Sequence, residues 1–270
     1  MSGSSTTAAE HSPCFLLTDF GDRDAYVGVM KAVMLSAAPS LPIVDLCHAI
    51  EPQNVLSAGY VLLTAVPYLP DGSIVVAVVD PGVGTRRRIV GIVFEGWTLL
   101  VPDNGLVSLV LERYQCRSAW EIAWERLRSS PPCATFHGRD IFAPCAALLA
   151  TKKRTLAHVG NPIDPASLVR LDTRPEARPQ GIVASILHVD RFGNLITNVE
   201  ATPWGIVPGA DWVCRVGQDV LPLVSTFGNV EPGESLAYIG SSGFIEIAVC
   251  NSSAAARYGT RPPVFIHHAP

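Results

Sequence analysis

The fold of this chain is constrained most by an apolar run that is followed by an acid and a tight turn. Residues Ser73–Val79 (SIVVAVV) are apolar enough for a strand buried on both faces, as in a parallel sheet. A turn of small residues, Asp80-Pro81-Gly82-Val83-Gly84-Thr85, follows at once. In open α/β sheets, ligands bind at the carboxyl ends of the strands. We therefore expect an α/β fold in which Asp80 lies at the functional edge of the sheet.

Two earlier runs end in the same way. Cys14–Thr18 leads into Asp19, and Leu41–Leu46 leads into Cys47-His48. If the three strands are parallel, these polar residues share one edge of the sheet. A single strand end of this kind has a simpler structural explanation. Pro81-Gly82 would only turn the chain, and Asp19 would cap the helix that begins near Asp24. Three converging strand ends favour a site instead.

Composition narrows the class of protein. With 270 residues, 48% apolar and 16% charged, the chain can bury a large core, and two domains are expected. The net charge is −4 and the basic runs, such as Arg86-Arg87-Arg88, are only three residues long, so we expect no nucleic-acid partner. Residues 1–12 have no signal-peptide pattern, and no later stretch is long and apolar enough to span a membrane. We expect a disordered tail over 1–12 and a cytoplasmic protein without membrane contact.

The sequence offers no metal or cofactor motif. It has no HExxH, no paired histidines of ligand spacing, no GxGxxG opening a helix and no P-loop, so neither a metal nor a dinucleotide is expected. The seven cysteines include no CxxC pair and are typical of free thiols. A hydrolase using Cys47 and His48 is an alternative, but neighbouring strand residues point to opposite faces and make a poor dyad.

The remaining pattern divides the chain. Residues 13–171 alternate strands with helices and predict an α/β domain, Rossmann-like with a mostly parallel sheet; the helices are expected at Asp24–Met34, Asn54–Tyr68, Leu106–Tyr114 and Arg139–Ala150, the last distorted by Pro144. Runs on either side of Glu95-Gly96 predict a β-hairpin. Residues 172–180 are rich in Pro and charge and predict a linker. Short runs separated by Gly, Pro and Asn predict an antiparallel β-barrel over 181–270.

Seven segments carry specific motifs. They are Thr18–Gly28 (TDFGDRDAYVG), His48–Val55 (HAIEPQNV), Val78–Arg88 (VVDPGVGTRRR), Val101–Leu106 (VPDNGL), Phe136–Asp140 (FHGRD), His188–Val199 (HVDRFGNLITNV) and Ile239–Val249 (IGSSGFIEIAV). In residues and in order they resemble the S-adenosyl-L-methionine hydroxide adenosyltransferases, relatives of the fluorinases and chlorinases. The resemblance implies an α/β domain followed by a β-barrel, and a homotrimer whose active sites lie between subunits. It also implies a cofactor-free hydrolysis of S-adenosyl-L-methionine, in which hydroxide displaces L-methionine from C5′ of the ribose and leaves adenosine.

The resemblance implies a catalytic triad of Asp80, Arg87 and His137. Arg87 matches the motif better than its basic neighbours because it falls two positions after Thr85. Asp80 and His137 would hold a water in line with the bond from C5′ to sulfur, and one of them would accept its proton, while the charge of Arg87 favours hydroxide. The alternative is an ion pair that holds the turn, with His137 capping the helix that follows Gly138.

The substrate contacts are implied in the same way. Asp19 is expected to accept both ribose hydroxyls, since a carboxylate can take two hydrogen bonds from a vicinal diol. The resemblance places Asp190, Asn194, Ser242, Glu246 and the backbone near Val249 in the part of the pocket that the barrel contributes. Glu246 could equally be a surface residue that alternates with Ile245 and Ile247.

Two other activities remain as alternatives. Fluorinases and chlorinases carry a Tyr where this chain has Asp80, and a carboxylate there repels a halide but can orient water, so hydrolysis is favoured over halogenation. A module that binds adenosine or S-adenosyl-L-methionine without turning it over would show the same motifs.

Overall fold

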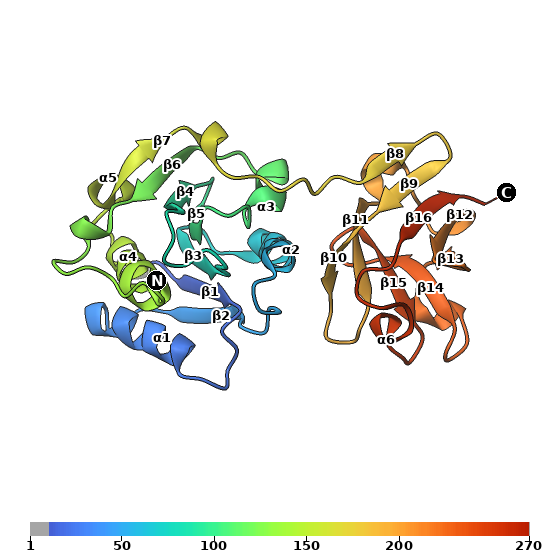
Figure 1. Cartoon of the computed structure of the whole chain (residues 1–270), viewed down its shortest axis with the longest axis horizontal. Helices are drawn as coiled ribbons and strands as arrows, with labels where there is room; N and C mark the ends of the chain where they lie inside the picture. The colour runs from blue at the N-terminus through green and yellow to red at the C-terminus, as the bar shows by residue number, and fades with distance from the viewer. Residues whose placement is uncertain (1–10, 270) are drawn as a thin grey trace, which may run out of the picture. The chain divides into compact units, whose positions relative to one another are not determined.

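The computed structural model describes residues 11–269, which form two compact units, the first ending at Leu171 and the second beginning at Asp172 (Figure 1). The tail expected over 1–12 lies outside the described residues, except for His11 and Ser12.

A seven-stranded sheet forms the centre of the first unit. Its order is β2-β1-β3-β5-β4-β6-β7, and β2, β1, β3 and β5 are mutually parallel, whereas β4 and β7 each pair antiparallel with their neighbours. The strands are β1 (Cys14–Thr18), β2 (Ile43–Cys47), β3 (Ser73–Val78), β4 (Ile89–Val93), β5 (Trp97–Pro102), β6 (Ser118–Ile122) and β7 (Gly160–Ile163). The expected α/β domain with a mostly parallel sheet is confirmed.

The parallel register brings the predicted strand ends together. Thr18 of β1 pairs with Val78 of β3, so Asp19 and Asp80 leave the sheet at the same edge. Every residue of both strands is buried, which matches their unbroken apolar runs. The hairpin expected around Glu95-Gly96 forms between β4 and β5, and Gly96 takes the left-handed φ of +80° that its turn requires.

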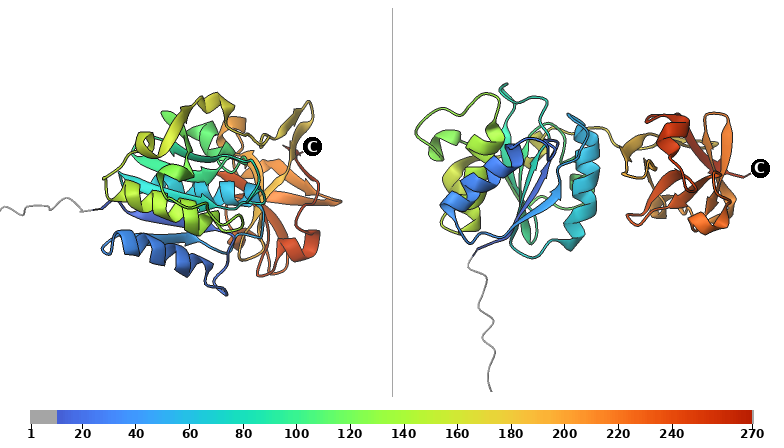
Figure 2. Two further views of the ribbon diagram at one scale, coloured as in Figure 1. Left: turned by 60° about the vertical axis from the view of Figure 1, so that its left-hand side comes forward. Right: turned by 90° about the horizontal axis from the view of Figure 1, so that it is seen from below.

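Helices cover both faces of this sheet. Helices α1 (Tyr26–Ala37) and α4 (Ala143–Ala150) pack on one face, and α2 (Val55–Ala65) and α3 (Ser108–Arg113) on the other (Figures 1 and 2). The short helix α5 (Leu156–Val159) precedes β7. All four predicted helices are therefore present, with ends shifted by a few residues.

Local chemistry explains where the helices begin. Asn54 caps α2 by accepting a hydrogen bond from the Ser57 amide at 3.0 Å. The distortion expected near Pro144 is a π-helical turn over Gly138–Phe142, directly before α4, since Pro144 has no N–H to donate. By contrast, Asp19 does not cap α1: Ala25 takes that position, without a side-chain hydrogen bond, and the capping interpretation of Asp19 is wrong.

The second unit is a curled nine-stranded sheet of order β10-β11-β15-β14-β13-β12-β16-β9-β8, antiparallel except between β13 and β14. Its strands are β8 (Glu176–Arg178), β9 (Gly181–Ala184), β10 (Ile186–Val189), β11 (Leu195–Glu200), β12 (Gly209–Val216), β13 (Asp219–Val224), β14 (Ser235–Ile239), β15 (Phe244–Val249) and β16 (Val264–His268), with helix α6 (Ala254–Tyr258) before β16. Strand β8 falls inside the segment expected to be a linker and pairs with β9. The sheet curls around its own apolar core, in keeping with the antiparallel barrel that the sequence predicts.

Within residues 11–269, no helix has the length and apolar character needed to cross a membrane.

The buried centre of the first unit should be sensitive to truncation. Leu100 of β5 is fully buried, so Leu100→Ala should lower the free energy of unfolding by about 2–5 kcal/mol, because it leaves a cavity. Val44 is 42% exposed, and Val44→Ala should change it by less than about 1 kcal/mol. Urea titration followed by helical circular dichroism measures this, since nearly all helix belongs to the first unit. Equal losses in the two variants would contradict the assignment of the core.

Candidate active site

A guanidinium group joins the three residues of the predicted triad. Arg87 Nε lies 3.0 Å and 2.8 Å from the two carboxylate oxygens of Asp80, and Arg87 Nη2 also donates to Asp80 Oδ2. The same Nη2 lies 2.8 Å from Nδ1 of His137. Both members of the ion pair are nearly buried, with 9% and 5% of their side chains exposed. The three predicted residues therefore form one contiguous group.

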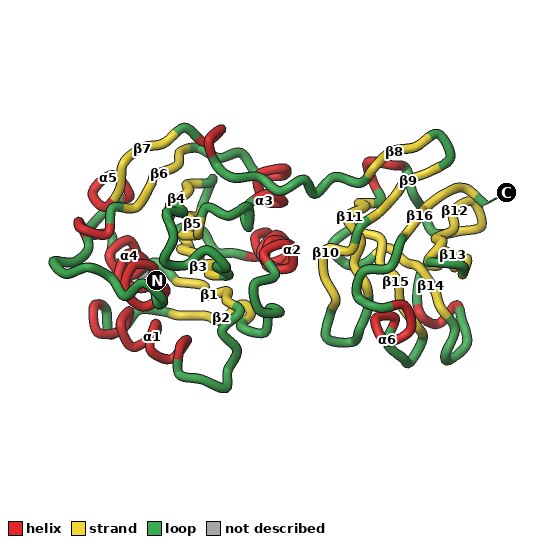
Figure 3. The backbone as a smooth tube through the Cα atoms, viewed as in Figure 1, coloured by secondary structure: helices red, strands yellow, loops and turns green. Residues whose placement is uncertain are grey.

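The loop from Asp80 to Arg87, which joins β3 to β4 (Figure 3), builds this arrangement from its own backbone. Gly82 N donates to Asp80 Oδ1 at 3.2 Å, and the Thr85 hydroxyl donates to the Gly82 carbonyl at 2.7 Å. Gly84 has a φ of +78°, and a Cβ there would lie 2.6 Å from the carbonyl oxygen of Ala134. Only glycine allows the loop to approach the segment that carries His137 so closely.

The contact with Arg87 fixes the tautomer of His137. A guanidinium can only donate, so Nδ1 of His137 accepts, and the neutral ring carries its proton on Nε2. Burial and the neighbouring charge of Arg87 lower the pKa of His137 below its usual 6.5, against the opposing effect of Asp80 and Asp140. His137 lies at the N-cap of the π-helical turn but makes no side-chain cap bond, so the capping interpretation is wrong.

Arg88 and Arg86, the neighbours of Arg87 in the sequence, lie in different surroundings. Arg88 binds Asp103 through Nε at 2.8 Å and Ser167 through Nη1 at 3.0 Å, and so ties β4 to the segment after β7. Arg86 is exposed. The structure therefore places Arg87, and neither neighbour, against Asp80.

A separate ion-pair cluster anchors the loop that presents His137. Asp140, 8% exposed, accepts from Arg139 Nε at 2.8 Å and from the Cys133 amide at 2.7 Å, and lies 3.0 Å from Arg128 Nη1. The hydrogen bonds from Arg139 outweigh burial and hold the pKa of Asp140 well below its usual range. The carboxylate thus stays charged and fixes the loop on both sides of His137.

Asp19 lies at the same edge of the sheet, where the Gln53 amide donates to its Oδ2 at 2.8 Å. Gln53 takes a left-handed φ of +66°, which is unusual for a residue other than glycine. Its strained backbone turns this N–H toward Asp19. Gln53 was not predicted from the sequence, because it contributes a backbone N–H and no side-chain pattern indicates such a donor.

Asp19, Asp80 and His137 face one cavity of about 550 Å³, a size suited to a small molecule. Three aromatic rings, Phe20, Tyr26 and Phe136, form one wall, with centroids 5.3–6.1 Å apart. The cavity is lined by Asp19, Phe20, Tyr26, Pro52, Gln53, Val78, Asp80, Val83, Thr135, Phe136, His137 and Gly138. The acids and the histidine were predicted from the sequence, but the aromatic wall was not.

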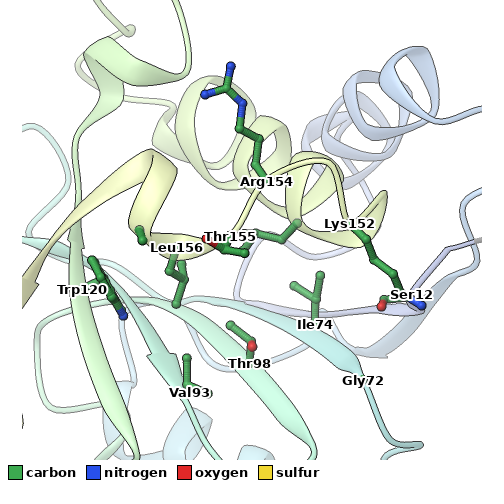
Figure 4. A pocket seen from close by; sticks show the side chains of 12 residues that line it. Ser12, Gly72, Ile74, Val93, Thr98, Trp120, Lys152, Arg154, Thr155 and Leu156 are labelled. Atoms are coloured by element: carbon green, nitrogen blue, oxygen red, sulfur yellow. The ribbon is translucent and has the colours of Figure 1, made fainter.

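A second cavity of the first unit, about 360 Å³, holds none of the predicted residues (Figure 4). It lies against Ile74 and Thr98, near the beginnings of β3 and β5, and is bordered by Leu156 and Lys152. The triad lies at the other end of β3, so this cavity is separate from it.

In the second unit, Asp190 and Asn194 form a closed turn between β10 and β11. Asp190 Oδ1 accepts from the amides of Phe192 and Asn194 at 2.9 Å and 2.8 Å, and Asn194 Nδ2 donates to Asp190 Oδ2 at 2.8 Å. Asn194 is 6% exposed. The two predicted binding residues thus hold each other in place.

Glu246 on β15 is buried, with 8% exposed, so it is not the surface residue of the alternative interpretation. Tyr238 of β14 lies opposite it in the antiparallel register and donates a hydrogen bond from its hydroxyl. Burial raises the pKa of Glu246, and the nearby charge of Asp190 acts in the same direction. Tyr238 was not predicted from the sequence, since the pattern of one strand does not tell which residue of the neighbouring strand lies opposite.

The last two predicted residues, Ser242 and Val249, lie on either side of Glu246 in the sequence. Ser242 lies in the turn between β14 and β15, and Val249 ends β15 with 1% of its surface exposed. Asp190, Asn194, Ser242, Glu246 and Val249 are all carried by the second unit.

The dyad alternative fails on geometry. The ring of His48 is engaged by Thr18 at 2.8 Å and by Asp45 at 2.9 Å, so neither nitrogen is free to activate Cys47. All seven cysteines are free thiols. Among residues 11–269, no group of three His, Cys, Asp or Glu side chains is arranged to hold a metal ion.

Comparison with known proteins shows which family the chain resembles over most of its length. Residues 14–160 match the family model of the SAM hydroxide adenosyltransferase N-terminal domain, and residues 184–265 match that of the C-terminal domain. The chain is 41% identical to an (R)-S-adenosyl-L-methionine hydrolase of Thermus thermophilus, over 92% of this chain and 96% of the relative. It is 26% identical to a fluorinase of Actinopolyspora mzabensis, over 91% and 93%. A crystal structure of a conserved protein from Thermotoga maritima superposes with a TM-score of 0.84 at 34% identity, covering 94% and 99% of the two chains.

The ionisation of His137 should depend on Arg87. In Arg87→Gln the cation is lost while Asp80 remains, so the pKa of His137 should rise from its lowered value, as NMR titration of the ring signals would show. The unfolded chain binds this proton at higher pH than the folded one, so stability should fall as the pH drops from 6.5 toward the lowered pKa. An unchanged titration in the variant would contradict the contact.

Proposed function

The chain belongs to the SAM hydroxide adenosyltransferase family, and we propose that it hydrolyses S-adenosyl-L-methionine to adenosine and L-methionine. Relatives named as (R)-S-adenosyl-L-methionine hydrolases align along most of the chain. The observation that carries the proposal is the group formed by Asp80, Arg87 and His137 beside a cavity of small-molecule size.

The reaction is a substitution at C5′ of the ribose. The oxygen of a water forms a bond to C5′ as the bond from C5′ to sulfur breaks, and that electron pair returns to sulfur to give the thioether of methionine. One proton of the water is released. The leaving group departs from a sulfonium as a neutral thioether and needs no acid, so catalysis consists of preparing and aiming the oxygen nucleophile.

The tautomer of His137 assigns it a donor role. Its Nδ1 lone pair is held by Arg87, so the ring has no free lone pair with which to accept the proton of the water. Its Nε2–H is left to donate to the incoming oxygen, which orients a lone pair of that oxygen toward C5′.

Asp80 is then the group that can accept the proton. Its oxygens already accept from Arg87 and from the Gly82 amide, but a carboxylate has about four lone-pair sites and can take one more hydrogen bond. The positive charge of Arg87 stabilises the hydroxide that forms beside it. In this arrangement Arg87 holds the other two residues and never changes its own charge.

The cavity suits a cationic substrate. Asp19 and Asp80 both line it, and with Arg87 paired to Asp80 one acid is left in excess, which favours a sulfonium. Asp19 would also accept the ribose hydroxyls, as the resemblance implies. No cofactor is needed, because the sulfonium activates C5′ by itself.

Residues of the second unit supply the remaining contacts in this proposal. Asn194 offers a paired donor and acceptor, and Asp190 with Glu246 gives a negative environment suited to the ammonium of the methionine part. Ser242 and the backbone at Val249 complete the set that the resemblance implies.

Halogenation is the second activity to weigh, since fluorinases are relatives. A halide needs hydrogen-bond donors, and the carboxylate of Asp80 offers none while its charge offsets the attraction of Arg87. The same carboxylate can hold and deprotonate water, so hydrolysis is the activity that the site supports.

Product analysis tests the proposal. Chromatography of the protein incubated with S-adenosyl-L-methionine should show adenosine and methionine, in amounts independent of chloride. Arg87→Ala should lower the rate by at least about 100-fold. His137 is then no longer held in one tautomer, and the charge that stabilises hydroxide is lost. The exposed neighbour variant Arg86→Ala is the matched control and should retain wild-type activity.

Two results would contradict the proposal. Chlorinated adenosine without adenosine would indicate a halogenase. Bound but unreacted S-adenosyl-L-methionine, with the same affinity in wild type and Asp80→Ala, would indicate a binding module.

We propose further that the protein is a homotrimer whose sites combine residues of two subunits, as the resemblance implies. Light scattering should then give three times the chain mass of 28.8 kDa. Asp80→Ala and Asn194→Ala, co-expressed with different affinity tags and purified as mixed oligomers, should recover activity that neither variant has alone, because some sites then receive both intact residues. No recovery in mixed oligomers would contradict shared sites.

A further inference from the structure

Four side chains, those of Lys31, Asp45, His48 and Thr18, form a hydrogen-bonded chain that ends at the residue before Asp19. Lys31 Nζ of α1 lies 2.6 Å from Asp45 Oδ2, Asp45 Oδ1 lies 2.9 Å from His48 Nε2, and His48 Nδ1 lies 2.8 Å from the hydroxyl of Thr18. Burial acts to raise the pKa of Asp45, but the hydrogen bonds from His48 and Lys31 outweigh it and keep the pKa below its usual value.

An irregularity in β2 makes this chain possible. Leu16 of β1 pairs with Asp45, and the next residue, Leu17, pairs with Cys47, so one extra residue is inserted in β2. Without this bulge, residues 45 and 48 would lie on opposite faces of the strand. With it, and with β2 ending at Cys47, the ring of His48 lies 2.9 Å from the carboxylate of Asp45.

The hydrogen bonds from Thr18 through His48 to Asp45 run in one direction, and Lys31 donates to Asp45 from the other side. A carboxylate only accepts, so with His48 neutral its proton lies on Nε2, and Nδ1 accepts from the Thr18 hydroxyl. The Thr18 oxygen in turn accepts from the Phe20 amide at 3.2 Å. Thr18 is fully buried, so removing its hydroxyl leaves both partners unsatisfied.

The backbone of His48 adds a second attachment. Its carbonyl accepts from the Gly21 amide at 2.8 Å. His48 therefore holds the segment 18–21 at both ends, through its ring at Thr18 and through its carbonyl at Gly21. The two residues between them, Asp19 and Phe20, both line the cavity, whereas neither Thr18 nor His48 does.

We propose that Thr18 and His48 are positioning residues that fix the carboxylate of Asp19 for the ribose hydroxyls of the substrate. The inference rests on the proposed function for the role of Asp19. A carboxylate that binds two vicinal hydroxyls must keep its orientation, and the strand-end clamp restricts the backbone on both sides of it.

A matched pair of variants tests this. Thr18→Val keeps the shape of the side chain but removes the hydroxyl, whereas Thr18→Ser keeps the hydroxyl. Calorimetric titration with adenosine should show an affinity roughly 10-fold lower in Thr18→Val and near wild type in Thr18→Ser. With 2′,3′-dideoxyadenosine, which lacks both hydroxyls, wild type and Thr18→Val should bind alike.

Turnover supplies a second readout. If the clamp acts on ribose binding, KM for S-adenosyl-L-methionine should rise in Thr18→Val by a similar factor, with a smaller change in kcat. If Thr18→Val fails to fold, Asp45→Ala can be tested instead, because Asp45 lies at a half-exposed position of the edge strand. This variant should also lower the affinity for adenosine. Glu95→Ala removes the carboxylate of another surface ion pair, at the opposite end of the strands, and should have no effect.

The proposal is overturned if Thr18→Val and Asp45→Ala bind adenosine as wild type does, if they weaken dideoxyadenosine equally, or if wild type does not bind adenosine. A wild type that binds adenosine with the expected pattern but does not turn over S-adenosyl-L-methionine contradicts the proposed function alone. The two failures are thus distinguishable.

Discussion

One guanidinium group organises the site. Arg87 donates to both oxygens of Asp80 and to Nδ1 of His137, so a single side chain fixes the positions of both partners. Asp80 and His137 are far apart in sequence and come from different elements, the end of β3 and the start of the π-helical turn before α4. The narrow approach at Gly84 and the ion pairs of Asp140 bring these elements together. The chemistry that we propose depends on this alignment, since an unheld His137 could present either nitrogen to the substrate.

The sheet supplies the rigid base for the site. Strands β1 and β3 are buried throughout and end in register, so Asp19 and Asp80 start from fixed positions. The clamp formed by His48 and the strained amide of Gln53 then orient Asp19. Catalytic and binding groups thus rest on short loops that are tied at both ends, which limits the reorganisation needed when substrate binds.

The sequence predicts the parts of this structure that follow from local patterns. Unbroken apolar runs predicted β1 and β3, Asn54 marked the start of α2, Gly96 marked the hairpin, and Pro144 marked the distortion before α4. The grouping of Asp80, Arg87 and His137 came from the resemblance, because no local pattern joins residues so far apart.

Features that depend on tertiary pairing could not be predicted. Alternation along β15 left Glu246 undecided, because a curled sheet buries positions that a flat one exposes, and Tyr238 on the neighbouring strand holds it. No residue type or pattern in the sequence indicates the bulge in β2 or the left-handed backbone of Gln53. Asp19 was a plausible helix cap until the structure showed its carboxylate accepting from Gln53 instead.

The central claim is that a water held by the triad attacks C5′ directly. A single turnover with enzyme in excess, carried out in water enriched in heavy oxygen, tests it by mass spectrometry of the adenosine. Direct attack predicts that the 5′ oxygen carries the heavy isotope from the first turnover. Unlabelled adenosine in that turnover, with the label in the carboxylate of Asp80, would show that Asp80 is the nucleophile and would contradict the account.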